Sequence, residues 1–121
     1  MALAAYDKAI KSNPQCAEAW NNKGSILYKL NRRDEAIFAY NEATKLNPSY
    51  VDAWYNLGGT LSSMGKYDEG IIAFDKALEI SPQSPLSQKI WSAKGKAHND
   101  LHQSVEAEAA FAKARELKDQ I

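Results

Sequence analysis

The chain of 121 residues has 15 basic and 15 acidic side chains and 45% hydrophobic residues, which are values of an ordinary folded protein. A formal net charge of zero argues against nucleic acid as the main ligand, because phosphate binding requires a clustered excess of Lys and Arg. Neither a membrane-length apolar run nor a signal peptide is visible, and the single cysteine, Cys16, excludes an internal disulfide, so a reducing, cytoplasmic setting is expected.

The first predicted helix covers residues 2–12, with Leu3, Tyr6 and Ile10 on one face. It ends before Pro14, because the residue preceding a proline is disfavoured in helical geometry. Two pairs of helices are expected downstream, over residues 16–30 and 34–46 and over residues 50–64 and 68–80.

The second of these pairs repeats the first. The segment AWNNKG beginning at Ala19 returns as AWYNLG at Ala53, and DEAIFAYNEA beginning at Asp34 returns as DEGIIAFDKA at Asp68. The offset is 34 residues in both cases, and a fixed period of this length is typical of stacked helical repeats. In the same register residues 2–12 align with a second helix, which we interpret as a fragment of a longer array or an unusual subunit.

The third copy departs from the strict period, since Trp54 and Trp91 are 37 residues apart. Three extra residues, at about positions 85–87, precede the later tryptophan. Ser84 followed by Pro85 is a favourable N-cap and first-turn pair, so the insertion is expected to start its helix nearly one turn early. The last two helices are predicted over residues 85–101 and 104–119. The chain divides into a half repeat and three repeats, at residues 1–14, 15–48, 49–84 and 85–121.

Each copy places a glycine inside a helix, where glycine costs roughly 1 kcal/mol relative to alanine. We interpret these glycines as points where the first helix of a repeat approaches the second, whose aromatic residues fill the surrounding space. Gly70 stands on a second helix where alanine would serve, so it is expected to be a weak point worth up to about 1 kcal/mol. The glycines are Gly24, Gly58 and Gly95, and the aromatic partners are Tyr40, Phe74 and Phe111.

The repeated pattern, Trp-x2-Leu-Gly, then Gly-x-Tyr-x-x-Ala, then Phe/Tyr-x2-Ala and Pro, resembles the tetratricopeptide repeat. The resemblance implies an all-α fold, an α-solenoid of about seven helices wound into a right-handed superhelix, with a concave face lined by first helices. The second copy carries the pattern as Trp54, Leu57, Gly58, Leu61, Gly65, Tyr67, Phe74, Ala77 and Pro82. The other copies depart from it at Lys23, Asn31, Arg33, Lys94, His102 and Ser104.

By this resemblance the concave groove binds a peptide segment of a partner protein, and no cofactor is expected. Asn22 and Asn56 are equivalent in the repeat, so their carboxamides could pair with the backbone of an extended peptide. The alternative is that these side chains are only solvated or cap local backbone. The groove residues implied are Asn21, Asn22, Ser25, Lys29, Tyr55, Asn56, Gly59, Ser63, Lys89, Ser92 and Lys96.

Other chemistries find weak support in the sequence. A clamp for two carboxylates, known in this family, is matched at two of five positions, Asn56 and Lys89, although Lys89 and Lys96 still favour an acidic partner. His98 and His102 are spaced i, i+4 but lack a third ligand, so no metal site is expected. No Ser/His/Asp arrangement or glycine-rich phosphate loop is present, so the chain is not expected to be an enzyme.

The alternative function is a scaffold that self-associates through its terminal helices, because stacked repeats without polar caps leave an apolar face open. A homo-oligomer would then form head to tail or by helix exchange. The residues expected to be partly exposed for this purpose are Leu3, Tyr6, Ile10, Val105, Ala109 and Leu117.

Overall fold

The computed structural model describes residues 2–120, and within them the chain forms α-helices and no strand. The seven helices are α1 (Ala2–Ser12), α2 (Ala17–Lys29), α3 (Arg33–Leu46), α4 (Val51–Ser63), α5 (Tyr67–Ile80), α6 (Pro85–Asp100) and α7 (Ser104–Gln120). The prediction of an all-α solenoid of seven helices is confirmed, and the helix predicted to start at the insertion begins at Pro85.

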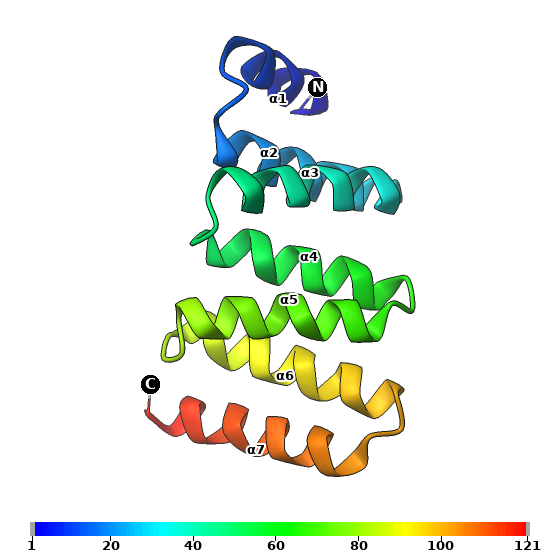
Figure 1. Cartoon of the computed structure of the whole chain (residues 1–121), viewed down its shortest axis with the longest axis vertical. Coiled ribbons are helices and arrows are strands. Elements are labelled where there is room, and N and C mark those ends of the chain that lie inside the picture. Colours follow the sequence, from blue (N-terminus) through cyan, green and yellow to red (C-terminus); the bar gives the residue numbers. More distant parts are fainter. Residues whose placement is uncertain (1, 121) are drawn as a thin grey trace.

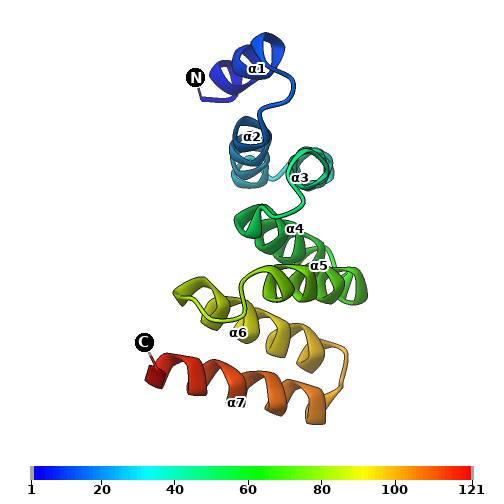
Figure 2. The same cartoon turned by 60° about the vertical axis from the view of Figure 1, so that its left-hand side comes forward.

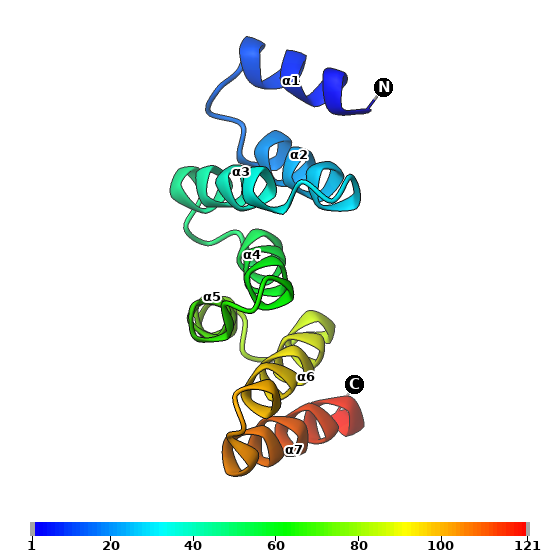
Figure 3. The same ribbon diagram turned by 90° about the vertical axis from the view of Figure 1, so that its right-hand side faces the viewer.

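The helices stack in chain order along one axis, so that the two chain ends lie at opposite ends of the molecule (Figure 1). The pairs α2–α3, α4–α5 and α6–α7 each pack closely, and each second helix also packs on the next first helix (Figure 2). The first helices α2, α4 and α6 contact one another in sequence, and α2 and α4 lie to one side of α3 and α5 (Figure 3). This layer of first helices carries the candidate site.

The turn inside each repeat requires a left-handed residue. The residues in this conformation are Asn31 (φ 63°), Gly65 (φ 80°) and His102 (φ 61°). In the middle repeat the amide of Lys66 donates to the carbonyl oxygen of Leu61 at 2.9 Å, which closes the helix in a Schellman motif. The same bond closes the other two turns. The glycine of the repeat pattern is therefore a backbone requirement, which the first and third repeats meet with residues that have a Cβ atom, Asn31 and His102.

Each repeat packs a glycine of its first helix against an aromatic ring of its second. In the middle repeat, a Cβ atom on Gly58 would lie 2.6 Å from Phe74 Cδ1, closer than side-chain atoms approach one another. The three pairs are Gly24–Tyr40, Gly58–Phe74 and Gly95–Phe111. The interpretation of these glycines as points of close helix approach is confirmed.

The expectation that alanine would serve at Gly70 is wrong. A Cβ atom there would lie 2.9 Å from the carbonyl oxygen of Gly58 and would overlap Ser62 Oγ. The Ser62 hydroxyl is itself buried and makes no hydrogen bond within the described residues. Gly70 is therefore needed because α4 and α5 approach each other backbone to backbone at this point.

The connections between repeats differ in the third copy. In the first two, the tryptophan indole donates to a proline carbonyl oxygen, from Trp20 to Pro14 at 3.1 Å and from Trp54 to Pro48 at 2.8 Å. Before α6, Ser87 is fully buried, its hydroxyl donates to the carbonyl oxygen of Ser81, and its amide donates to Ser84 Oγ at 3.2 Å. The insertion thus starts α6 directly after the N-cap Ser84 and adds the buried Ser87 to its first turn.

The two terminal helices differ in what they expose. On α1, Leu3, Tyr6 and Ile10 are half-buried. On α7, Val105 is 80% exposed, but Leu117 is only 2% exposed. The expected exposure of Leu117 is wrong, because this residue continues the buried stripe of Ala107, Ala110 and Ala114 on the helix that packs against α6.

Candidate functional site

Two adjoining cavities open along the layer of first helices, with volumes of about 380 Å³ and about 180 Å³. Tyr28 of α2, Gly59 of α4 and Ala93 of α6 line both of them, so the cavities form one groove across three repeats. The larger cavity is completed by Ser62, Ser63, Tyr67, Phe74, Lys96, Ala97 and Asp100, and the smaller by Tyr40, Tyr55, Asn56 and Thr60.

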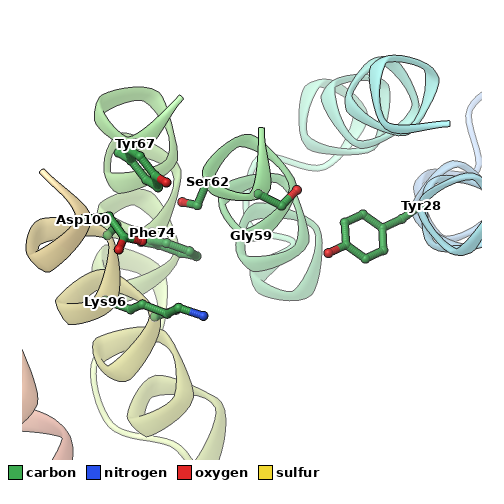
Figure 4. Close-up of a pocket in the computed structure, with 10 residues that line it drawn as sticks. Tyr28, Gly59, Ser62, Tyr67, Phe74, Lys96 and Asp100 are labelled. Atoms are coloured by element: carbon green, nitrogen blue, oxygen red, sulfur yellow. The ribbon is translucent and has the colours of Figure 1, made fainter. Parts of the chain in front are cut away.

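Gly59 lies at the centre of this groove, with Tyr28 on one side and Lys96 on the other (Figure 4). A Cβ atom on Gly59 would meet no other atom within 4 Å. The residues at the same repeat position in the other first helices are Ser25 and Lys96, which both carry side chains. The width of the groove at this point therefore comes from the missing side chain.

A chain of polar contacts links the first helices α2 and α4 at one edge of the groove. Asn56 Nδ2 donates to Asn21 Oδ1 at 3.1 Å, and Asn21 Nδ2 donates to the Tyr50 hydroxyl at 3.3 Å. Asn21 is only 6% exposed, so the expectation that it faces a ligand is corrected: it positions Asn56 instead. Asn56 lines the smaller cavity and keeps its carbonyl oxygen and its second N–H group for other partners.

Burial shifts the pKa of two tyrosine hydroxyls at the edge of the groove. Burial raises the pKa of Tyr40, whose hydroxyl donates to Ser25 Oγ at 3.2 Å. Burial also raises the pKa of Tyr50, which accepts the hydrogen bond from Asn21. Lys96 and Asp100 are the charged residues that line the larger cavity, and neither takes part in an ion pair among the described residues.

The remaining residues predicted for the groove are placed unevenly. Tyr55 lines the smaller cavity, whereas Ser63 and Lys96 line the larger one. The others lie outside both cavities: Asn22, Ser25 and Ser92 are half-buried, and Lys29 and Lys89 are exposed. Asn22 and Asn56 are therefore not brought into the same cavity.

Sequence reasoning missed several lining residues. Asp100 occupies the same repeat position as Lys29 and Ser63 when the three-residue insertion is counted, so the repeat register could have identified it. Tyr67 and Phe74 belong to α5, and no signal in the first helices points to them. Ala93 occupies the same repeat position in α6 as Asn56 does in α4, and its small side chain leaves the groove open.

No group of three His, Cys, Asp or Glu side chains within the described part of the chain is placed to hold a metal ion. His98 Nδ1 lies 2.7 Å from Gln103 Oε1, and His102 is the left-handed residue of the last turn. Among residues 2–120, the structure contains no helix with both the length and the apolar character needed to cross a membrane.

Comparisons with known proteins identify the repeat. Family profiles described as "TPR repeat" match residues 24–65, and profiles described as "Tetratricopeptide repeat" match residues 51–84 and residues 2–44. A comparison with curated protein sequences finds no significant match.

Solved structures of MamA share the fold. The structure described as "Crystal structure of MamA" has a TM-score of 0.91 and 30% identity over 98% of this chain and 67% of its own. A second, "Crystal structure of MamA protein", has a TM-score of 0.89 and 30% identity over 98% of this chain and 63% of its own. A third, "MamA MSR-1 C2", has a TM-score of 0.84 at 23% identity over 98% of this chain and 66% of its own.

The chain thus spans about two thirds of the length of these MamA structures. The repeats and the shared fold are those of a protein-interaction scaffold. Three repeat matches that together extend from residue 2 to residue 84, and the fold shared over nearly the whole chain, show that this protein belongs to the tetratricopeptide repeat family.

Proposed function

We propose that the protein binds an extended peptide segment of a partner protein in the groove along α2, α4 and α6. The observation that carries this proposal is the continuity of the groove across three repeats at Tyr28, Gly59 and Ala93. A shallow continuous groove with polar edges suits a peptide, which needs backbone partners at intervals together with recesses for its side chains.

Asn56 is the residue best placed to hold a peptide backbone. Its hydrogen bond to Asn21 fixes the orientation of the carboxamide, so less rotamer freedom is lost when a peptide binds. The free carbonyl oxygen and second N–H can then pair with one peptide unit. Asn22 is the equivalent residue one repeat earlier, and it extends the same contact outside the two cavities.

The charges around the groove suit a peptide of low net charge better than a strongly acidic one. Lys29 and Lys89 are exposed beyond the cavities, but within the larger cavity Lys96 is balanced by Asp100. An acidic partner would gain from the two outer lysines and lose at Asp100, and exposed charges contribute little at physiological ionic strength.

The test is a selection of random 12-residue peptides displayed on phage against the immobilised protein, followed by fluorescence anisotropy with the selected peptides. Tyr55→Ala and Asn56→Ala should each weaken binding by about tenfold, the cost of losing one contact worth about 1.4 kcal/mol. Ile72→Ala is the matched control, since Ile72 is 61% exposed and lies outside the groove. Peptides that bind both groove variants as tightly as the control would overturn the proposal.

Self-association through α1 is a second candidate, favoured by two exposed alanines. Ala5 and Ala9 are exposed, whereas Ala39 and Ala43 at the equivalent positions of α3 are 1% and 0% exposed beneath α2. The equivalent face of α7 does not support stacking, because it carries Glu108 and Arg115 where α5 has the buried residues Ile71 and Leu78.

Sedimentation equilibrium up to high micromolar concentration tests this second candidate. Ala5→Glu/Ala9→Glu should convert an oligomer to a monomer, because it places charge on the open face. Ala4→Glu is the matched control on the same helix, since its repeat equivalents Phe38 and Ile72 are exposed. A wild-type protein that is already monomeric throughout the concentration range would exclude self-association.

A further inference from the structure

Two neighbouring glycines of α4 have opposite relationships to the packing. Gly58 is required, because a side chain there would collide with Phe74. Gly59 is not, because a Cβ atom there would meet nothing within 4 Å. A glycine in the interior of a helix costs roughly 1 kcal/mol relative to alanine. The packing of the chain therefore explains Gly58 and leaves Gly59 without a structural reason.

The absence of a side chain at Gly59 joins the two cavities. Gly59 lines both, and it lies between Tyr28 and Lys96, which belong to the neighbouring first helices. An alanine at this position would project into the open space at the joint. The glycine that costs helix stability thus lies where the two cavities meet, and the larger cavity has a volume of about 380 Å³. That volume lies within the range of ligand pockets, about 300–1,000 Å³.

The lining of the larger cavity indicates what kind of side chain it can take. Tyr28 of α2 and Tyr67 of α5 contribute aromatic rings, and α6 contributes the small residues Ala93 and Ala97. The Phe74 ring also borders the cavity, but it is only 1% exposed because it packs against Gly58. Aromatic side chains favour edge or offset contacts with other rings and bury about 150–250 Å² each. Flat walls next to small residues therefore suit an aromatic ring better than a branched aliphatic group.

The charges of the cavity argue against a charged occupant. Lys96 and Asp100 are one helical turn apart on α6, and both line the cavity. A cationic side chain would be attracted by Asp100 and repelled by Lys96, and an anionic one the reverse, so neither sign of charge gains. A neutral ring avoids this conflict and contributes the full area that it buries.

We propose that the cavity at Gly59 is the anchor site of the groove and takes one aromatic side chain of the bound peptide. This inference rests on the peptide-binding function proposed above and names the side chain that the groove selects. Gly59 acts here as a specificity-determining residue, because its missing side chain leaves free the space that the ring occupies.

The first experiment titrates the N-acetyl amides of Trp, Tyr, Phe, Leu, Arg and Glu at millimolar concentration into ¹⁵N-labelled protein. The three aromatic amides should shift the backbone resonances of Gly59, Ala93 and Ala97 in a saturable manner. The Leu, Arg and Glu amides should shift them several-fold less. Equal shifts with the non-aromatic amides, or no saturable shift with any of the six, would overturn the proposal.

Variants at Gly59 test the geometry. Gly59→Ala should raise the thermal midpoint, because alanine is the better helix former and finds open space, and should weaken binding of the aromatic amides at least threefold. Gly59→Leu fills more of the cavity and should abolish the shifts. Ser84→Ala serves as a control that alters stability at the start of α6, ahead of all the residues of that helix that line the cavity, and should bind as the wild type does. Unchanged aromatic binding by Gly59→Leu would contradict the assignment.

The phage-selected peptides separate this inference from the function on which it rests. Peptides that require Tyr55 and Asn56, contain an aromatic residue and lose affinity in Gly59→Leu would support both. Some peptides could require Tyr55 and Asn56, lack an aromatic residue and bind Gly59→Leu with unchanged affinity. That result would refute the anchor site but not the peptide-binding function. Aromatic amides that bind at Gly59 when no peptide is selected would support the site and refute the peptide function.

Discussion

Lys94 Nζ lies 2.6 Å from Asp75 Oδ1 and 4.9 Å from the centre of the Trp91 ring, so that α6 is tied to the preceding helix α5. The same arrangement occurs two repeats earlier. Lys23 Nζ lies 2.7 Å from Asp7 Oδ1 and 5.4 Å from the centre of the Trp20 ring. The middle junction has Leu57 and Asn41 at the two equivalent positions, which shows that a buried leucine and an ion pair are alternative solutions to the same contact.

The middle junction predicts how the Lys94–Asp75 contact responds to substitution. Asp75→Asn should lower the free energy of unfolding by about 1 kcal/mol, because the Lys94 side chain is only 18% exposed and would lose its charged partner. Lys94→Leu should change it by less than about 0.5 kcal/mol, since the exposed Asp75 stays solvated. In Asp75→Asn/Lys94→Leu, which reproduces the middle junction, the loss should disappear. Urea denaturation measures all three, and additive effects would contradict a direct coupling.

The left-handed residue of the third turn is a site where stability can be gained. His102 has φ 61° and bears a Cβ atom, whereas the equivalent Gly65 has φ 80° without that penalty. His102→Gly should raise the free energy of unfolding by about 1 kcal/mol, and Gly65→Ala should lower it by a similar amount. His102→Asn should lie between the wild type and the glycine variant, because asparagine tolerates this conformation. Thermal denaturation checks the order, and a destabilised His102→Gly would show that the imidazole itself supports the turn.

The contact between Ser62 and Gly70 predicts two changes of opposite sign. Ser62→Ala should stabilise the protein by about 1 kcal/mol, since it removes a buried hydroxyl that makes no hydrogen bond. Gly70→Ala should not yield the gain of about 1 kcal/mol that helix propensity alone predicts, because the added Cβ atom meets the Gly58 carbonyl oxygen at 2.9 Å. In the Ser62→Ala background the penalty of Gly70→Ala should be smaller. Urea denaturation of the wild type, the two single variants and the double variant gives a double-mutant cycle. Free-energy changes that are fully additive would exclude the proposed overlap between Ser62 and a Cβ atom at position 70.

The hydrogen-bonded serines at the start of α6 should contribute more to stability than a serine of the same helix without such a bond. Ser87→Ala should lower the free energy of unfolding by about 1–3 kcal/mol, because the carbonyl oxygen of Ser81 would lose its donor within a fully buried site. Ser84→Ala removes the N-cap and should cost about 1 kcal/mol. Ser92→Ala, on the same helix and without such a bond among the described contacts, is the control. Chemical denaturation with equal losses for Ser87→Ala and Ser92→Ala would argue against the buried hydrogen bond.

The sequence by itself determined the architecture of this protein. The 34-residue period, the prolines between repeats and the glycines opposite Tyr40, Phe74 and Phe111 are local signals, and each forces one geometry: a helix stop, a close approach or a left-handed turn. The insertion before Trp91 could be placed for the same reason, because Ser84 and Pro85 form a helix start on their own.

Only the tertiary structure decided which residues form the groove. Asn21 and Asn56 are both polar, lie on first helices and bond to each other, yet Asn21 is buried and Asn56 lines the smaller cavity. Gly59 and Gly70 are both glycines inside helices, but one faces open space and the other a backbone carbonyl oxygen. Such differences depend on atoms distant in the chain, which a repeat pattern does not encode.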